Sequence, residues 1–140
     1  LPPEVSRLEG EDAIESIVRM EEAVYSSPRD WLRAYLLHLH RARPDLLSLY
    51  GAVVSGQLVS AAWIIYYEGS PFASILGGAT LPEYRARGFY TALLASRARE
   101  AHQRGVRFLA VDASSMSAPI LAKHGFIALE QTTYCRWSPQ

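Results

Sequence analysis

The sequence predicts an α/β fold, with a central mixed β-sheet of about six to seven strands flanked by about four helices. Two observations indicate this fold. Near the start of the chain, apolar residues recur at helical spacing, and three long runs of β-branched and aromatic residues follow. A helix, strand, helix and strand pattern comes next. Antiparallel strands therefore lead into a crossover, which we expect to be right-handed, with helices packed on both faces of the sheet.

The N-terminal part is predicted to contain a short strand and two amphipathic helices. The strand covers Val5 to Leu8, and the first helix runs from Glu11 to Tyr25. Ser27 is a suitable N-cap for the second helix, Pro28 suits its first position, and the helix is expected to end before Pro44. The buried stripe of this helix is predicted to consist of Trp31, Tyr35, Leu36 and Leu39.

Three long strands are predicted in the middle of the chain. Leu46 to Val54 and Leu58 to Tyr67 are separated by Ser55-Gly56-Gln57, a sequence typical of a hairpin turn. Phe72 to Leu81 follows as the third strand. Because the connections are short, these strands are expected to form an antiparallel meander.

A crossover unit is predicted after the meander. Phe89 to Arg104 has helical spacing, and Gly105 supplies a stop signal. Val106 to Val111 is typical of a short buried strand, Ser117 to His124 of a short helix, and Phe126 to Trp137 of one or two closing strands. The apolar face of the long helix is predicted to consist of Tyr90, Leu93, Leu94, Ala98 and Ala101, with its polar residues, Arg97 included, mostly elsewhere.

Composition limits the classes of function. A chain of 140 residues fits one domain, taken here as 1–140. Its 14 basic and 14 acidic residues balance, so no global field attracts nucleic acid or an anionic membrane. No apolar run approaches the roughly 18 residues of a membrane span, and the four histidines lack metal-ligand spacing. The single cysteine, Cys135, offers no intramolecular disulfide, which favours a reducing, cytoplasmic location.

The most informative segment is the connection from the third long strand to the long helix. Arg85 and Arg87 precede Gly88, and the helix begins directly afterwards. The first turn of a helix has unbonded amide groups and the positive end of the helix dipole, which suits a phosphate. Gly88 allows close approach to the backbone and a positive φ. The alternative is a solvated strand-to-helix connection without a ligand.

This segment resembles the signature of the GNAT superfamily of acyl-CoA-dependent N-acyltransferases, Q/R-x-x-G-x-G/A. Here the pattern is Arg85-x-x-Gly88-x-Tyr90, after a strand that ends near Pro82. A short helix that ends in Gly125-Phe126 matches a second feature of the family. The resemblance covers nearly the whole chain and implies an acyltransferase that uses acetyl-CoA, with no metal.

By this resemblance, two stretches of backbone hold the co-substrate. The main chain of Gly78, Ala79 and Thr80 would pair with the pantetheine arm. Ser114, at the place of a frequent asparagine, either bonds a pantetheine amide or an ordered water, or caps the following helix. The pyrophosphate would lie on the backbone of Arg85, Ala86, Arg87, Gly88, Phe89, Tyr90 and Thr91.

The chain departs from the family pattern at three places. Tyr90 replaces a small residue, and its ring either joins the core, which its helical position favours, or crowds the phosphate. Leu121 replaces the tyrosine proposed in the family as the general acid. The strand from Phe72 to Leu81 contains no acid to remove the amine proton. The remaining candidates for a catalytic role, none of them assigned, are Glu68, Asp112 and Tyr134.

The function that these residues imply is acetyl transfer from acetyl-CoA to an amine of a small molecule or protein, by direct attack of the amine. Two alternatives remain open: a degenerate acyl-CoA-binding domain with a regulatory role, and a structural subunit. A homodimer is a further expectation. The acceptor is not readable beyond an aromatic lining suggested by Trp31, Tyr35, Tyr66 and Tyr134.

Overall fold

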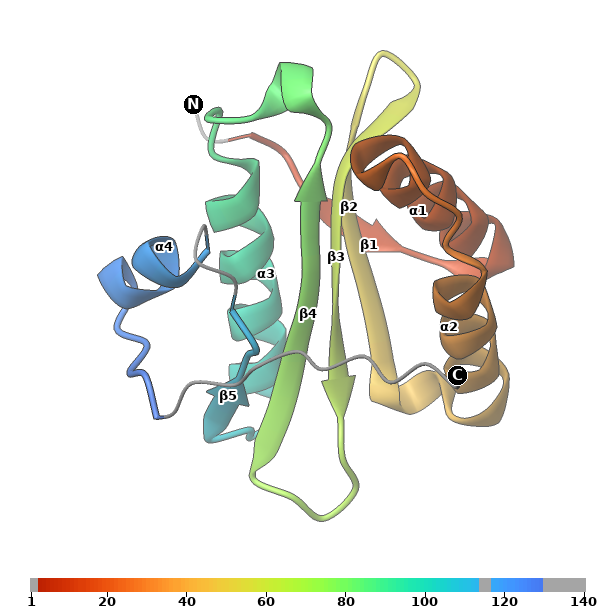
Figure 1. Cartoon of the computed structure of the whole chain (residues 1–140). Helices are drawn as coiled ribbons and strands as arrows, with labels where there is room; N and C mark the ends of the chain where they lie inside the picture. The colour runs from red at the N-terminus through yellow and green to blue at the C-terminus, as the bar shows by residue number, and fades with distance from the viewer. Residues whose placement is uncertain (1–2, 114–116, 130–140) are drawn as a thin grey trace, which may run out of the picture.

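The computed structural model describes residues 3–113 and 117–129. Its centre is a five-stranded sheet in the order β1-β2-β3-β4-β5 (Figure 1). Neighbouring strands from β1 to β4 are antiparallel, and β5 is parallel to β4. The predicted mixed sheet and the crossover are confirmed. The strands are β1 (Ser6–Leu8), β2 (Leu47–Val54), β3 (Gln57–Tyr66), β4 (Phe72–Thr80) and β5 (Phe108–Ala110).

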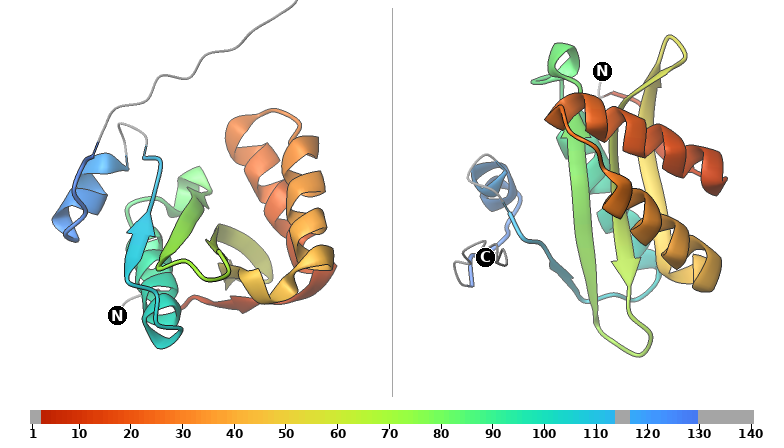
Figure 2. Two further views of the ribbon diagram at one scale, coloured as in Figure 1. Left: turned by 90° about the horizontal axis from the view of Figure 1, so that it is seen from below. Right: turned by 45° about the vertical axis from the view of Figure 1, so that its right-hand side comes forward.

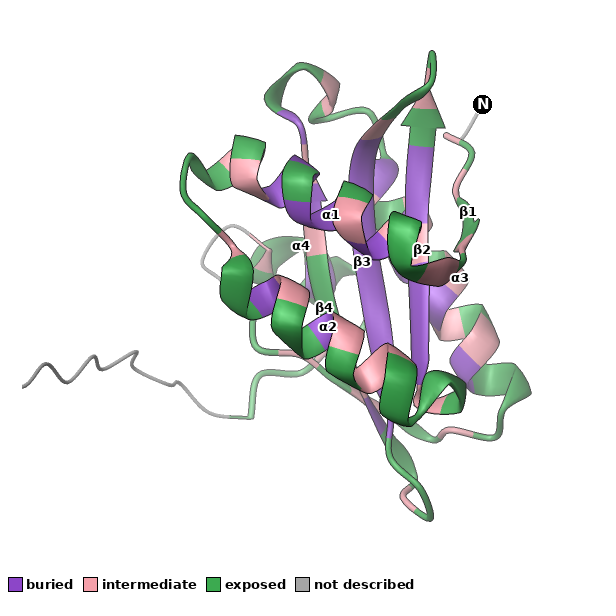
Figure 3. Ribbon diagram, turned by 90° about the vertical axis from the view of Figure 1, so that its right-hand side faces the viewer, coloured by how far each residue is buried: buried purple, intermediate pink, exposed green. Residues whose placement is uncertain are grey.

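Helices cover both faces of the sheet. Helices α1 (Gly10–Tyr25) and α2 (Asp30–Ala42) lie on one face, and α3 (Phe89–Gln103) and α4 (Ala118–Lys123) lie on the opposite side (Figure 2). The outer surfaces of α1 and α2 are exposed, whereas the strands beneath them are buried (Figure 3). Two short 3₁₀ helices, at Pro44–Leu46 and Pro82–Tyr84, complete the described elements.

The central strand β3 divides the interior into two apolar clusters. Because side chains alternate along a strand, Trp63 and Ile65 pack with α1 and α2, whereas Ile64 and Tyr66 pack on the side of α3 and α4. The residues of β3 from Val59 onward are buried on both faces. Because β4 pairs with β3, its position is set by a strand that is packed on both faces.

The predicted hairpin between β2 and β3 is confirmed. Its loop consists of Ser55 and Gly56, with φ of 52° and 79°. Two positive φ angles are typical of the turn type that matches the natural twist of a hairpin. The predicted stop of α3 is confirmed as well, since Gly105 has a φ of 79° and its amide donates to the His102 carbonyl.

The predicted start of α2 is wrong. The helix begins at Asp30 after Arg29, and the Arg29 amide donates to the Glu22 carboxylate at 3.0 Å. This tertiary bond replaces the local cap expected from Ser27. The buried stripe is also displaced, because Trp31 and Tyr35 are 61% and 43% exposed. The side chains that face the core are Leu32 and Leu36, with Leu39 partly buried.

The C-terminal part of the sheet differs from the prediction of a buried strand and about six to seven strands in all. β5 has three residues, and Phe108 is 47% exposed. It is the edge strand of the described sheet, which leaves its outer side without a neighbour there. The described part of the predicted closing strands, residues 126–129, is not strand, and the rest of that prediction lies outside the described residues.

Candidate functional site

The connection from β4 to α3 presents a helix N-terminus. Gly88 is the N-cap, with a φ of 87°, and Ala86 before it has a φ of 60°. The first bond of the helical ladder runs from the Ala92 amide to the Gly88 carbonyl at 3.0 Å. The amides of residues 89–91 therefore precede the ladder, at the positive end of the helix dipole. This is the backbone geometry predicted for an anion site.

Two arginines flank this N-terminus. The Arg85 Nε donates to the Thr80 carbonyl at 3.2 Å, which ties the loop to the end of β4. The Arg87 guanidinium lies 5.1 Å from the centre of the Tyr84 ring. Both side chains are exposed, and neither forms an ion pair with any described residue. No carboxylate of the described residues therefore neutralises their charges.

A β-bulge lies in β4 next to the loop. Ala61 pairs with Ala79 and Ala62 pairs with Gly77, so Gly78 is the extra residue. Gly77 and Gly78 have φ angles of 77° and 100°. A Cβ on Gly77 would lie 2.7 Å from the Trp63 ring, so the backbone and ring approach too closely for any other residue.

The edge of β4 beside the bulge is open. Within the described residues, β5 pairs only with Phe72–Ser74 of β4, and the strand continues to Thr80 without a partner on that side. The backbone groups beyond Ser74 can therefore pair with an extended, amide-bearing ligand. The Trp63 ring lies against Gly77 of the bulge, and its Nε1 is buried without a hydrogen-bond partner in the described part of the chain.

Tyr90 turns towards the sheet. It is partly buried and packs with the apolar cluster on the side of α3 and α4. A Cβ on Gly78 would lie 2.8 Å from its ring, so the ring covers the bulge glycine. Of the two orientations considered from the sequence, the structure has the one in which the ring joins the core.

Arg97 is the residue of this region that sequence reasoning missed. Its guanidinium is buried, and Nη1 donates to the carbonyls of Trp63 and Leu76 at 3.2 and 3.0 Å. Burial lowers its pKa to about 10, although Tyr90 acts in the opposite direction. The sequence signal that could have indicated its burial is its spacing, four residues after Leu93 and four before Ala101, both of which are buried.

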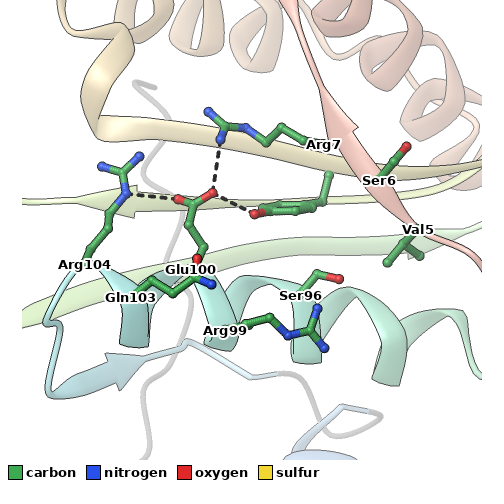
Figure 4. Close-up of a pocket in the computed structure, with 9 residues that line it drawn as sticks. Val5, Ser6, Arg7, Ser96, Arg99, Glu100, Gln103 and Arg104 are labelled. Atoms are coloured by element: carbon green, nitrogen blue, oxygen red, sulfur yellow. Dashed lines mark hydrogen bonds and ion pairs between the residues drawn. The ribbon is translucent and has the colours of Figure 1, made fainter.

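A second polar group that faces the sheet is Glu100 of α3, which is partly buried and lies nearly one turn after Arg97. Burial tends to raise its pKa, but hydrogen bonds from Ser48, Tyr50 and Tyr66 outweigh this and lower it. The same carboxylate pairs with Arg7 at 3.1 Å and lines a shallow cavity of about 530 Å³ between α3 and the start of β1 (Figure 4). This network joins α3 to the sheet, far from the candidate anion site along the helix.

The structure does not gather the candidate catalytic residues. Glu68 pairs with Arg43 at 3.0 Å and follows β3, at the Phe72 end of β4 and away from the loop. Asp112 is exposed after β5. Leu121, in α4, is 2% exposed and belongs to the apolar cluster beneath α3. Two further candidates, Tyr134 and Ser114, lie outside the described residues.

The described residues offer neither a cluster of metal ligands nor a helix that could span a membrane. They contain no group of three or more histidine, cysteine, aspartate or glutamate residues that could hold a metal ion. In the same part of the chain, no helix is long and apolar enough to cross a membrane.

The molecule is thus an α/β domain with a mixed sheet, in which the bulged strand β4 ends beside the N-terminus of α3. The sequence model of the Acetyltransferase (GNAT) family matches residues 11–126. The chain therefore belongs to this family of acetyltransferases. A comparison with curated protein sequences found no match.

Solved structures share the fold. A predicted acetyltransferase from Clostridium acetobutylicum, solved with acetyl-CoA, has a TM-score of 0.79 at 19% identity, over 95% of each chain. The aminoglycoside acetyltransferase AAC(6')-Iy, solved with a CoA-containing bisubstrate analogue, has a TM-score of 0.75 at 22% identity, over 97% of this chain and 98% of its own. The 6'-N-acetyltransferase AAC(6')-Ih from Acinetobacter baumannii has a TM-score of 0.72 at 19% identity, over 98% of this chain and 99% of its own.

Proposed function

We propose that this domain transfers the acetyl group of acetyl-CoA to an amine of a small molecule or protein. The observation that carries the proposal is the position of Gly88. Its left-handed backbone begins α3, so that the amides of the first turn stand ahead of the helical ladder, at the end of the connection from β4. A pyrophosphate needs these amides, and an amide-bearing arm needs the open edge of β4 that precedes them.

The co-substrate lies along both features. The pyrophosphate contacts the amides of residues 89–91 and the charges of Arg85 and Arg87. The pantetheine arm pairs with the open edge of β4 from Thr80 towards Gly78, and the thioester reaches the bulge. Support comes from the close contacts at Gly77 and Gly78, which leave the bulge without side chains that would block the arm.

The reaction is a direct transfer. The amine nitrogen attacks the thioester carbonyl carbon, the C–S bond breaks, and CoA leaves as a thiolate with the electron pair. The proton of the amine passes to water. Positioning supplies most of the catalysis, since holding two reactants in line removes a large part of the entropic cost of reaction.

The acceptor is a primary amine whose identity is the open part of the proposal. Several structural neighbours are named as aminoglycoside acetyltransferases, so aminoglycosides belong in the test set. Release of free CoA thiol is measured with acetyl-CoA and a panel of aminoglycosides, small amines and peptides. Turnover of any amine above hydrolysis supports the proposal, and its absence across the panel with intact CoA binding supports the alternative below.

The alternative is an acyl-CoA-binding domain that has lost catalysis. Buried Leu121 and the absence of an acid in β4 favour it. Acetyl-CoA would then bind without any turnover.

Three coarser expectations accompany the proposal. The chain 1–140 is taken as one domain, the location as cytoplasmic, and the assembly as a homodimer. Light scattering of the purified protein tests the last of these.

A further inference from the structure

Arg97 is a buried cation without an anionic partner among the described residues. It is 1% exposed, and no carboxylate of the described residues lies within ion-pair distance of it. Its described partners are three backbone carbonyls, of Leu93 at 3.1 Å, Trp63 at 3.2 Å and Leu76 at 3.0 Å. Burying such a charge is costly, and an apolar side chain of similar size would pack there at lower cost.

The carbonyls that Arg97 binds mark a particular place in the sheet. Trp63 and Leu76 face each other across β3 and β4, and the next pair along the strands begins the bulge. One nitrogen of a side chain on α3 therefore holds both strands where the ladder becomes irregular. Gly77, with its positive φ, directly follows one of the two carbonyls.

The charge persists at neutral pH. Burial lowers the pKa of Arg97 only to about 10, so the guanidinium stays protonated at pH 7. The titratable group that acts on it is the Tyr90 phenol, whose ring covers Gly78. A permanent positive charge thus lies behind the bulge, on the side of the sheet that carries α3.

We propose that Arg97 is a positioning residue for acyl transfer, which fixes the β4 bulge through the Trp63 and Leu76 carbonyls and places an unpaired positive charge where the CoA thiolate leaves. The inference rests on the proposed function. When the C–S bond breaks, sulfur takes the electron pair, and Leu121 cannot supply a proton. A nearby cation lowers the free energy of the thiolate without proton transfer.

The first experiment measures the pKa of the CoA thiol when bound, from the ultraviolet absorbance of the thiolate, with the ligand-free protein subtracted. Wild type is compared with Arg97→Gln, which keeps a donor but loses the charge, and Arg97→Lys, which keeps the charge. Arg99→Gln, an exposed position on the same helix, is the matched control. Binding of ADP, which has the pyrophosphate but no pantetheine, shows that each variant is folded.

The expected result separates charge from packing. In wild type, Arg97→Lys and Arg99→Gln, the bound thiol has a pKa below that of free CoA. In Arg97→Gln it rises by about one unit, the effect of one nearby opposite charge. If Arg97 had a purely structural role, Arg97→Lys and Arg97→Gln would change the pKa of the bound thiol alike.

Two results would overturn the inference. The first is a CoA thiol whose pKa is the same when bound to the wild-type protein as in free CoA. This result would contradict the inference even if Arg97→Gln failed to bind ADP. The other is the same thiol pKa in wild type and a folded Arg97→Gln. Failure of wild type to bind CoA at all contradicts the proposed function instead, so the two failures are distinguishable.

Kinetics give a second readout once an acceptor is known. Arg97→Gln is expected to lower kcat about tenfold, which corresponds to one unit in the leaving-group pKa, with a smaller change in KM for acetyl-CoA. Arg97→Lys retains most of kcat. A loss confined to KM would contradict the role assigned to the charge.

Discussion

Gly88 is the residue whose backbone directs the first turn of α3. Its φ of 87° is a conformation that costs other residues about 1 to 2 kcal/mol. Among the described residues an added Cβ would meet only Pro3, at 3.4 Å, so steric contact with them is slight. The effect of substitution therefore separates into backbone strain and lost access to the amides.

We expect Gly88→Val to weaken acetyl-CoA binding about tenfold more than Arg87→Ala, because the exposed Arg87 contributes only about 0 to 1 kcal/mol. Gly105→Val is the matched control, since Gly105 has a φ of 79° and a Cβ there would meet no atom of the described residues within 4 Å. Both valine variants should lose similar stability, and only Gly88→Val should lose binding. Calorimetric titration measures this. Equal losses for Gly88→Val and Arg87→Ala would show that side-chain charge, not the helix N-terminus, holds the anion.

Leu121 has a consequence for the pH dependence of turnover. Without a proton donor at this position, the rate should follow the fraction of unprotonated amine, rising to a plateau near the pKa of the acceptor. The pH profile of kcat/KM tests this. Leu121 is 2% exposed, so Leu121→Tyr would overpack the core around it, at a cost of about 1 to 3 kcal/mol of stability. An alkaline limb that vanishes when Tyr134 or another enzyme group is replaced would contradict the prediction.

A residue's role could be predicted from the sequence where its neighbours along the chain determine that role. It was missed where the partners lie far apart in the sequence. Gly88 was found because a turn and a helix start are set by neighbours in sequence. Arg97 was missed because its partners, Trp63 and Leu76, lie on two strands. Glu100 was missed for the same reason, since its hydroxyl partners come from β2 and β3.

At the scale of elements, α3 is attached to the sheet by polar contacts at its C-terminal half. Glu100 accepts from Ser48 at 2.6 Å, Tyr50 at 2.6 Å and Tyr66 at 2.5 Å, and it pairs with Arg104 at 3.2 Å. These bonds hold the ionised carboxylate, and its pKa is lowered from 4.5 in spite of burial. The stability from this group is therefore present above its ordinary pKa and is lost as the pH falls through the lowered value.

We expect Glu100→Gln to destabilise the protein by about 2 kcal/mol at pH 7, as charged hydrogen bonds become neutral. The difference from wild type should shrink as the pH falls from the ordinary carboxyl range through the lowered pKa of Glu100, because the wild-type carboxyl then becomes neutral as well. Thermal unfolding across this range measures it. Glu9→Gln is the control, since its side chain is 80% exposed. A Glu100→Gln difference that is constant with pH would exclude the charged network as its source.

Element boundaries were predictable where the signal is local and wrong where tertiary contacts decide. The β2–β3 hairpin and the end of α3 follow from turn residues. The start of α2 depends on Glu22, which binds the Arg29 amide from the preceding helix. The exposure of Phe108 could not be read from an apolar run, because a run does not show whether its strand has neighbours on both sides.

At the scale of the whole molecule, the proposed ligand lies between parts that the chain itself joins weakly. β5 pairs with three residues of β4, whereas β3 pairs with β4 over nearly its whole length. A CoA molecule on the open edge of β4 and the N-terminus of α3 would connect the meander with the crossover unit. Binding should thus stabilise the fold beyond the local loop.

We expect acetyl-CoA at about 100 times its Kd to stabilise the protein by about 2.7 kcal/mol, because a ligand that binds only the native state shifts unfolding by mass action. Dephospho-CoA should act nearly as well, since the pyrophosphate is the main anchor.

Thermal unfolding gives the size of this stabilisation, and amide exchange gives its location. Protection should increase in β4 beyond Ser74 and in the first turn of α3, because the arm and the pyrophosphate occupy these amides. Gly88→Val should lose both effects at the same concentration, whereas Gly105→Val should keep them. A wild-type protein that shows no thermal shift with millimolar acetyl-CoA would contradict CoA binding itself, and a shift with protection elsewhere would place the ligand at a different surface.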